Sequence, residues 1–419
     1  MLKLSVFTPT HDPRWLPDLY RSLAAQTHPD WEWVIVPNGP KAVEIPDDIK
    51  ADRRVKIVPS THTKIGALKR FACTQCSGHV YVEADHDDAL TPNALAAVAA
   101  AAERHGVGFY YSDFVSYYPN HVSEEYSNFH GWKSYDFEYR GKVYQAQRAF
   151  EPSARSLCDI SYAPNHVRAW HRDAYYKAGG HDASLAVGDD HDLLCRTYLA
   201  DVAFVHIPEC LYFYRRVIDP KRDNSWLVHN EEVQHVNLLN MNKYIHRLAE
   251  AEARRRGLRL IDLGGAHNSP PGYESLDVVD ADVIFEVGSG PLPFPDDSVG
   301  VIRAFDFFEH VPREKFVAAM NDFYRVLAPG GWVLSGTPST DGRGAFQDPT
   351  HVNFMNENSY WYYCNREHAK YVKEIQCRFQ GVRIWTEAPS DFHRHHNIPY
   401  VYADLVALKG QRAPGPCHI

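Results

Sequence analysis

The chain has 419 residues, of which 44% are hydrophobic and 23% are charged, values typical of folded globular proteins. Its 44 basic and 53 acidic residues give a net charge of −9, and no Lys/Arg tract dominates any region. Disordered, fibrous and broadly nucleic-acid-binding proteins are therefore excluded, and we expect no nucleic-acid partner. Eight scattered cysteines favour a reducing compartment over a disulfide framework.

The sequence predicts a cytoplasmic protein and leaves peripheral association with a membrane open. The first apolar run, within Met1–Thr10, is shorter than the hydrophobic region of a signal peptide and is typical of a first strand. No window contains the ~18 apolar residues that a membrane helix needs. We therefore expect no transmembrane segment.

Strand-like and helix-like patterns alternate in the first hundred residues. Strands are predicted at Leu4–Phe7, Trp33–Val36, Val55–Val58 and His79–Val82, and helices at Leu16–Gln26, Ile65–Cys76 and Thr91–Arg104. Such alternation is the signature of a mostly parallel α/β sheet. Residues 115–165, rich in aromatic residues and histidine, break this rhythm, and we interpret them either as loops over a binding face or as a packing insert.

A long polar helical stretch at 227–256 separates two halves of the chain. After it, a second alternation has strands at Leu258–Leu263, Ser275–Val279, Val299–Ala304 and Trp332–Ser335, and a helix at Arg313–Leu327. We therefore predict an α/β domain at 1–226, a helical linker at 227–257 and a second α/β domain at 258–419. Cys73 and Cys76 form a C-x-x-C pair without a second pair nearby, which favours a structural role over zinc binding.

Acidic residues follow the predicted strand that ends near residue 82. Asp85 and Asp87 alternate as D-x-D at the strand end, the edge where open α/β sheets bind ligands. Both carboxylates can reach one Mg²⁺ or Mn²⁺ ion, which would neutralise a diphosphate leaving group. The alternative for such a pattern alone is a solvated acidic turn.

A second acidic cluster, Gly188-Asp-Asp-His-Asp192, leads into a predicted helix. One of its carboxylates can serve as a general base that removes the proton of an acceptor hydroxyl during sugar transfer. Together, the two acidic clusters favour a transferase active site over a solvated acidic turn.

Five ordered motifs make residues 1–225 resemble family 2 glycosyltransferases of GT-A fold. These motifs are Ser5-Val-Phe-Thr-Pro-Thr-His11, Trp33-Val-Ile-Val36, Ala84-Asp-His-Asp-Asp88, Gly179-Gly-His-Asp182 with Gly188-Asp-Asp-His-Asp-Leu193, and Leu211-Tyr-Phe-Tyr-Arg-Arg216. The resemblance implies a nucleotide-sugar donor, a UDP-sugar or another nucleoside-diphosphate sugar, and a glycan or lipid-linked glycan acceptor.

The resemblance also implies roles for individual residues. Asp190 corresponds to the catalytic base, and Asp85 and Asp87 correspond to the metal ligands, with His229 as a candidate third ligand. The residues implied to bind the nucleotide sugar are Pro9, Thr10, Asn38, Lys69, Arg70 and Asp85. Asn38 lies where the family usually has an Asp pair, and because an amide both donates and accepts, it leaves the donor base open.

The second half contains a glycine turn after its first strand, at Asp262-Leu-Gly-Gly265. Glycine allows the backbone to approach a bound nucleoside or amino acid closely. Asp277, at the end of the next strand, can accept hydrogen bonds from two ribose hydroxyls, although a structural capping role is the alternative.

Three further segments, Leu292–Val299, Phe308–Pro312 and Tyr324–Gly331, make residues 258–345 resemble class I methyltransferases. The resemblance implies an S-adenosylmethionine site formed by Asp262, Gly264, Gly265, Asp277, Glu286 and Asp306, and a base for methyl transfer at His310 or His351. The usual third glycine is absent, and about a dozen residues separate Gly265 from Asp277, too few for the usual first helix.

The sequence as a whole therefore predicts a bifunctional enzyme of glycan synthesis. One half would transfer a sugar with a divalent metal and with inversion, and the other would methylate a glycan with S-adenosylmethionine. The alternative is a glycosyltransferase whose second half is a non-catalytic binding or assembly module.

Overall fold

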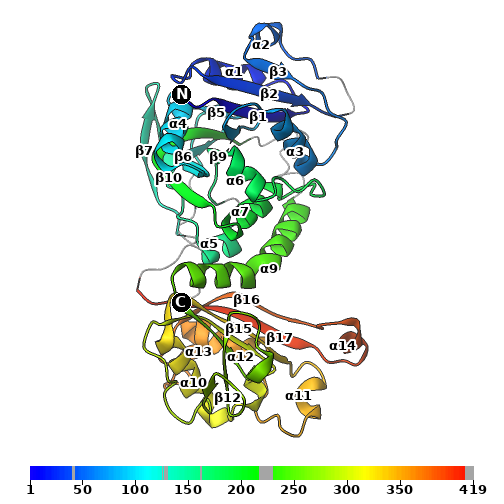
Figure 1. Cartoon of the computed structure of the whole chain (residues 1–419), viewed down its shortest axis with the longest axis vertical. Coiled ribbons are helices and arrows are strands. Elements are labelled where there is room, and N and C mark those ends of the chain that lie inside the picture. The colour runs from blue at the N-terminus through cyan, green and yellow to red at the C-terminus, as the bar shows by residue number, and fades with distance from the viewer. Residues whose placement is uncertain (40–42, 125, 127–130, 161–162, 217–229, 411–419) are drawn as a thin grey trace. The chain divides into compact units, whose positions relative to one another are not determined.

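The structure is a computed structural model that describes residues 1–39, 43–124, 126, 131–160, 163–216 and 230–410. The chain divides into two compact units (Figure 1). Met1–Pro152 and Ile160–Tyr244 form the first unit, and Ser153–Asp159 and Ile245–Ile419 form the second. Nothing in the sequence pattern indicated that the short segment with helix α5 (Ala154–Asp159) would belong with the second unit.

Helix α9 (Asn230–Arg255) lies within the predicted helical stretch, and the division between the units falls inside it, after Tyr244. Residues 227–229 of that stretch lie outside the described residues. The domain boundaries at 226 and 258 stay predictions.

The sheet of the first unit has the strand order β3-β2-β1-β4-β9-β6-β10-β5, and β8 pairs with β6 and β7. The strands β1, β2, β3 and β4 are parallel, and β9 is antiparallel to β4 and β6. The strands are β1 (Leu4–Thr10), β2 (Trp31–Pro37), β3 (Val55–Ile57), β4 (Val80–Glu83), β5 (Ala89–Leu90), β6 (Gly108–Tyr117), β7 (Ser134–Tyr139), β8 (Lys142–Gln147), β9 (Arg168–His171) and β10 (Ala203–Arg215). Residues 115–165 thus contribute the end of β6, the β7–β8 hairpin and α5.

The helices of this unit bury apolar faces against the sheet. Alternate side chains of β1 and β2, such as Val6 and Trp33, form one core with Leu19 of α1 and Val98 of α4. The helices are α1 (Leu16–Ala24), α2 (Asp47–Ala51), α3 (Ile65–Gln75), α4 (Ala94–His105), α6 (Arg172–Lys177) and α7 (Asp189–Leu199). The periodicity of the sequence predicted α1, α3 and α4 because their apolar residues recur at helical spacing.

The second unit has a seven-stranded sheet in the order β13-β12-β11-β14-β15-β17-β16. The first five strands of this order are parallel, and β17 is antiparallel to both of its neighbours. The strands are β11 (Arg259–Leu263), β12 (Glu274–Asp277), β13 (Val283–Ile284), β14 (Val299–Phe305), β15 (Leu327–Pro338), β16 (Phe379–Glu387) and β17 (Tyr400–Ala407). Two α/β units, as predicted from the alternating patterns, are confirmed.

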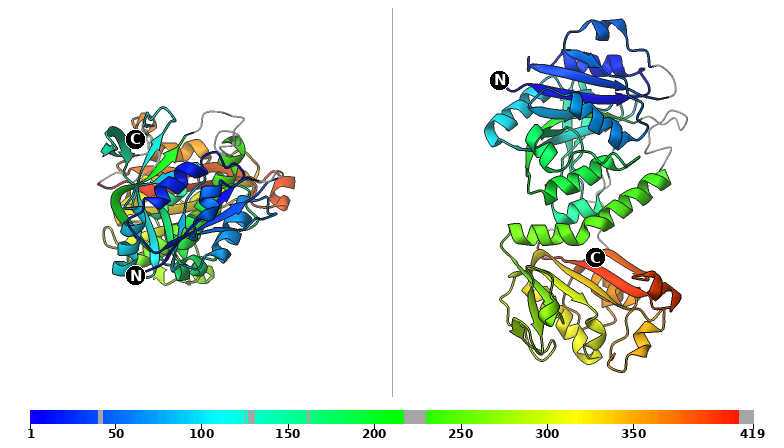
Figure 2. Two further views of the ribbon diagram at one scale, coloured as in Figure 1. Left: turned by 90° about the horizontal axis from the view of Figure 1, so that it is seen from above. Right: turned by 45° about the vertical axis from the view of Figure 1, so that its right-hand side comes forward.

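Helices cover both faces of this sheet (Figure 1 and the right-hand view of Figure 2). Met320 of α10 and Tyr360 of α12 lie in the core on one face. On the other, Ala253 of α9 lies directly over Gly300, where an added Cβ would come within 2.4 Å of the alanine Cβ. The helices are η2 (Ala266–Asn268), η3 (Phe308–His310), α10 (Arg313–Val326), α11 (Gly344–Gln347), α12 (Glu357–Cys364), α13 (Arg366–Ala369) and α14 (Asp391–His395).

Gly66 allows α3 to pack closely against the loop that precedes α7. A Cβ at this position would lie 2.0 Å from the carbonyl oxygen of Asp182, a backbone atom that cannot move alone. We expect Gly66→Ala to lower the free energy of unfolding by about 1–3 kcal/mol, the usual cost of overpacking. Thermal unfolding measures the effect, with Gly290→Ala as the control because its added methyl group would meet no atom within 4 Å. Equal transition temperatures for the two variants would contradict this prediction.

Candidate active sites

The carboxyl ends of β2, β1 and β4 form one edge of the first sheet. Thr10 pairs with Pro37 and Phe7 pairs with Glu83, so the residues that follow the three strands meet at this edge. The backbone N–H of Asn38 donates to the carbonyl of Thr10 at 2.9 Å. The predicted nucleotide-sugar residues Pro9, Thr10, Asn38 and Asp85 therefore lie at the ends of neighbouring strands, where open α/β sheets bind ligands.

A buried charge network lies behind this edge. Lys69 of α3 donates to Glu83 Oε1 at 2.5 Å, and its ammonium group lies 3.6 Å from Asp189. Arg168 of β9 donates to Asp190 Oδ2 at 2.6 Å and lies 3.8 Å from Glu83. Buried charges are stable only when they are paired, so the two cations hold the three carboxylates in fixed positions. The predicted donor-binding residue Lys69 is thus 5% exposed and engaged within the protein.

The two carboxylates at the start of α7 have opposite pKa shifts. Burial raises the pKa of Asp189 to about 7, although the nearby positive charge of Lys69 acts to lower it. Burial would also raise the pKa of Asp190, but Arg168 and Lys69 outweigh it and hold that pKa below its usual value. Below about pH 7 Asp190 is therefore the mainly ionised member of the pair.

The acidic strand end after β4 is held by β10. Tyr212 accepts from the backbone N–H of Asp85 at 3.1 Å and donates to Asp88 at 2.8 Å. Arg215 donates from its Nε to the carbonyl of Asp87 at 2.7 Å. Burial, together with the neighbouring Asp85 carboxylate, raises the pKa of Asp87, because adjacent carboxylates disfavour a second negative charge. A bound cation would relieve this repulsion.

The structure brings together one set of metal-ligating atoms at this edge, from Glu83, Asp85 and His166, all within 4.8 Å of one another. Among the described residues, Glu83 Oε2 and His166 Nε2 are buried and have no hydrogen-bond partner. Nε2 lies 3.8 Å from Glu83 Oε1 and 3.7 Å from Asp85 Oδ2, distances that leave space for an ion or a water between the groups. Asp87 is not a member of this set, although it is adjacent along the chain.

One other predicted residue, Arg70, lies outside this arrangement. Arg70 is exposed and donates to the carbonyl of His181 at 3.2 Å. His229 lies outside the described residues.

Sequence reasoning missed Glu83, His166 and Arg168. Glu83 is a charged residue inside an otherwise apolar strand, and a buried charge there should have indicated a partner or a ligand. His166 and Arg168 follow the aromatic region 115–165, which we interpreted either as loops over a binding face or as a packing insert. The proximity of Arg168 to Glu83 depends on the antiparallel pairing of β9 with β4. No local sequence pattern indicates the register of that pairing.

In the second unit, Asp262, Gly264 and Gly265 form a tight turn after β11. Asp262 accepts from Arg303 at 2.7 Å and from Ser269 at 2.8 Å. A Cβ at Gly265 would lie 2.1 Å from the Asp262 carboxylate, and Gly264 has a φ of +75°. The turn therefore requires both glycines, and it exposes backbone at the carboxyl edge of the sheet.

Two predicted cofactor residues follow the neighbouring strands. Asp277 ends β12, and Val278 N–H donates to its Oδ1 at 2.6 Å, which leaves acceptor capacity on the other oxygen. Asp306 follows β14, is exposed and accepts from Tyr400 at 2.7 Å. Glu286 lies farther out, after the edge strand β13, and forms an ion pair with Lys315 at 3.0 Å.

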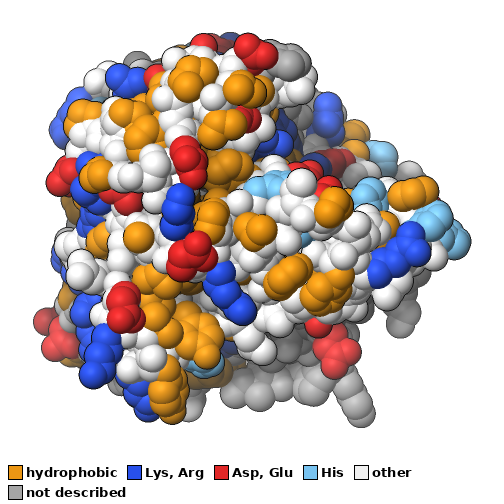
Figure 3. Space-filling model, turned by 90° about the horizontal axis from the view of Figure 1, so that it is seen from below, with side chains coloured by type: hydrophobic (Ala, Val, Ile, Leu, Met, Phe, Trp, Pro, Cys, Tyr) orange, Lys and Arg blue, Asp and Glu red, His pale blue; other side chains and the backbone are white. Residues whose placement is uncertain are grey.

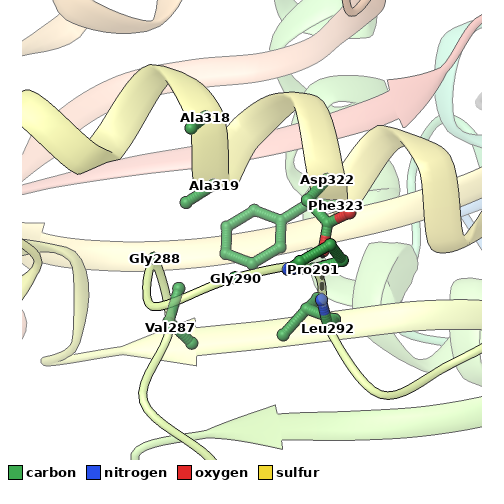
Figure 4. A pocket seen from close by; sticks show the side chains of 9 residues that line it. All are labelled: Val287, Gly288, Gly290, Pro291, Leu292, Ala318, Ala319, Asp322 and Phe323. Carbon is green, nitrogen blue, oxygen red and sulfur yellow. Dashed lines mark hydrogen bonds between the residues drawn. The ribbon is translucent and has the colours of Figure 1, made fainter.

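The only helix between Gly265 and β12 in the described residues is the three-residue η2, in agreement with the expected loss of the usual first helix. A pocket of about 290 Å³ lies between residues 287–292 and α10, where Leu292 N–H donates to Asp322 at 2.5 Å (Figure 4). None of the predicted cofactor residues lines it. We therefore interpret this pocket as imperfect packing beside the helix.

His310, exposed at the end of η3, and His351, half-buried, lie close together although 40 residues separate them. Their ring centroids are 5.1 Å apart, and both contribute to a second set of metal-ligating atoms with Glu309.

The sheet topology and the acidic strand ends define a chain with two transferase-like α/β units. Residues 5–159 match the family described as Glycosyl transferase family 2, and residues 227–335 match the family described as Methyltransferase domain. The chain is therefore a transferase that carries a family 2 glycosyltransferase domain and a class I methyltransferase domain.

The chain also has a distant likeness to crystal structures of S. aureus TarS. It is 17% identical to TarS over 61% of this chain and 43% of that chain, with a TM-score of 0.39. It is 15% identical to TarS 1-349 in complex with UDP-GlcNAc, over 61% of this chain and 73% of that one, with a TM-score of 0.41. The chain thus spans less than half the length of full TarS. No curated protein matches it.

Within the part of the chain that the structure describes, no helix is both long enough and apolar enough to cross a membrane.

Proposed function

We propose that the first domain transfers a sugar, with inversion, from a nucleoside-diphosphate sugar to a hydroxyl group. The observation that carries this proposal is the juxtaposition of an ionised, buried Asp190 with the acidic strand end at Asp85 in a family 2 glycosyltransferase domain. Asp190 accepts the proton of the attacking hydroxyl, and Arg168 fixes the orientation of its carboxylate. Thr10 and Asn38 at the neighbouring strand ends contact the nucleoside.

A divalent ion, Mn²⁺ or Mg²⁺, fits the acidic edge. Asp85 and Asp87 would hold it, and the unpartnered oxygen of Glu83 and the unpartnered nitrogen of His166 supply suitable further ligands. The ion supplies positive charge to the departing diphosphate. His229 remains a candidate ligand from the sequence. The acceptor would be a glycan or a lipid-linked glycan.

The donor is tested by incubating the chain with a panel of nucleotide sugars and Mn²⁺ and measuring the released nucleoside diphosphate. We expect release from one or a few sugars that share a base. Release from none, with or without candidate acceptors, would contradict the proposed glycosyl transfer.

The second domain, we propose, methylates a glycan with S-adenosylmethionine. The cofactor fits the carboxyl edge of β12, β11 and β14, since Gly264 and Gly265 expose backbone there and the free acceptor oxygen of Asp277 suits a ribose hydroxyl. S-Adenosylmethionine supplies an electrophilic methyl group. Asp262 and Asp306 border the methionine part, and Glu286 lies on the side of the adenine.

Asp277→Ala is expected to weaken S-adenosylmethionine binding by about 1–3 kcal/mol, the range for losing hydrogen bonds to a charged acceptor. Isothermal titration calorimetry measures the change, with Asp280→Asn as a nearby exposed control. Equal affinity of Asp277→Ala and wild type would place the cofactor elsewhere. No binding to the wild-type chain would instead favour the non-catalytic module.

A further inference from the structure

The second domain contains a group of side chains that the proposed cofactor site does not use. Glu309 of η3 lies with its neighbour His310 and with His351, and their ligand atoms are all within 4.8 Å of one another. We propose that these three residues form a divalent metal site that binds the hydroxyl group to be methylated. This proposal rests on the proposed methyl transfer to a sugar, but the metal site itself can be tested separately.

The burial of Glu309 points to a cationic ligand. The residue is 2% exposed, and Thr337 of β15 donates to its Oε2 at 2.5 Å. Among the described residues, no Lys or Arg side chain forms an ion pair with it. A buried carboxylate in a protein is normally paired with a cation or coordinates a metal. The Thr337 hydroxyl orients the carboxylate but cannot neutralise it.

The hydrogen bonds of the two histidines use Nδ1, which leaves Nε2 available as a ligand. His351 Nδ1 lies 3.0 Å from the carbonyl of Ala345, and since a carbonyl can only accept, Nδ1 carries the proton and Nε2 keeps its lone pair. His310 Nδ1 lies 3.3 Å from the hydroxyl and 3.4 Å from the carbonyl of Thr350. Hydrogen bonds of this kind on the second ring nitrogen are typical of metal-bound histidines.

Backbone hydrogen bonds hold the distant histidine over η3. The N–H groups of Val352 and Asn353 both donate to the carbonyl of Glu309, at 2.8 and 3.0 Å. Asn353 also donates from its side chain to the carbonyl of Phe308 at 3.3 Å. The segment with His351 is thus fixed to the residue that supplies the carboxylate, so the three ligands are preorganised.

The site adjoins the proposed cofactor edge. Glu309 and His310 follow Asp306 at the carboxyl end of β14, and Phe307 between them packs against Gly264, where an added Cβ would lie 2.7 Å from its ring. The candidate metal ligands Glu309 and His310 therefore follow directly along the chain from a residue whose ring contacts the glycine turn. A hydroxyl bound to the metal would be close to the transferable methyl group.

Two imidazoles and a carboxylate suit Zn²⁺ or another first-row divalent ion and leave coordination positions open. A metal-bound hydroxyl loses its proton more readily than a free one. Its oxygen then forms a bond to the methyl carbon while the bond from that carbon to the sulfonium sulfur breaks. The sulfur leaves as a neutral thioether, and the hydroxyl proton passes to solvent. His310 and His351 would accordingly be ligands, and neither would be the base.

The test is a calorimetric titration of the metal-free chain with Zn²⁺, in an Asp85→Ala background that removes a ligand of the first site. We expect one tight equivalent, and at least ~10-fold weaker binding after Glu309→Gln or His310→Ala. Glu309→Gln retains the acceptor for Thr337, and His310 is exposed, so both variants should fold.

Exposed histidines elsewhere provide the control. On the face of the molecule in Figure 3, histidine side chains gather toward the projecting right-hand end, and α14 with the residue after it carries His393, His395 and His396. His395→Ala should leave the tight equivalent unchanged. Unchanged Zn²⁺ binding in both Glu309→Gln and His310→Ala, or loss of the tight equivalent only in His395→Ala, would overturn the metal site. Tight, Glu309-dependent binding without methyl transfer to any sugar would support the site and refute only the proposed methylation.

Discussion

Asp190→Asn is expected to reduce glycosyl transfer by at least ~10²-fold, with little change in donor affinity. The amide has nearly the size of the carboxylate but cannot accept the proton of the attacking hydroxyl, and general-base catalysis contributes about 10²–10⁴-fold. The structure supports this choice because Arg168 and Lys69 keep the pKa of Asp190 low despite burial. Steady-state rates and donor titration together separate the loss of catalysis from a loss of binding.

The adjacent Asp189→Asn is the matched control. Burial raises the pKa of Asp189 to about 7, so below that pH its carboxyl is mostly neutral and an amide replaces it closely. We expect a much smaller loss of activity at pH 6 for this variant. The opposite ranking would assign the base to Asp189 and would contradict the role of Asp190. Circular dichroism must show that Asp190→Asn is folded, because Arg168 loses its nearest anion in that variant.

Asp87→Ala and removal of divalent ions are both expected to abolish glycosyl transfer. A metal supplies several kcal/mol of charge stabilisation to a leaving diphosphate, which corresponds to a loss of ~10³-fold or more. Excess chelator should abolish glycosyl transfer by the wild-type chain, and Mn²⁺ or Mg²⁺ should restore this activity. The activity of Asp87→Ala should not recover at the ion concentration that restores the activity of the wild-type chain.

An acidic residue outside the acidic edge of the first sheet serves as a control for the loss of a negative charge alone. Asp48 is exposed on α2, and Asp48→Ala should retain wild-type activity and the same ion requirement. Full activity of the wild-type chain in excess chelator would remove the metal from the mechanism.

Local patterns were sufficient to predict the α/β class and most elements near the sites. The alternation of apolar strands and amphipathic helices depends on neighbouring residues, so it identified β1, β4 and α3 in the first unit and β11, β14 and α10 in the second. The glycine turn at Gly264 was recognisable because its backbone conformation excludes larger residues.

Contacts between distant segments could not be predicted in the same way. The proximity of Arg168 to Asp190 depends on the packing of β9 beside α7, and that of His166 to Glu83 depends on strand register. Likewise, His351 was considered only as a base, because the backbone hydrogen bonds that hold it beside Glu309 join segments 40 residues apart. The assignment of α5 to the second unit likewise depends on contacts between segments that are distant in the sequence.

The two-activity account is tested most directly by mass spectrometry of one acceptor incubated with both donors. With the wild-type chain, we predict that the product gains one glycosyl residue and, when S-adenosylmethionine is present, one further methylene unit. With Asp190→Asn and an acceptor that already carries the sugar, the methylene increment should persist. A product that gains the sugar but never the methylene increment, from a chain shown to bind S-adenosylmethionine, would contradict the account.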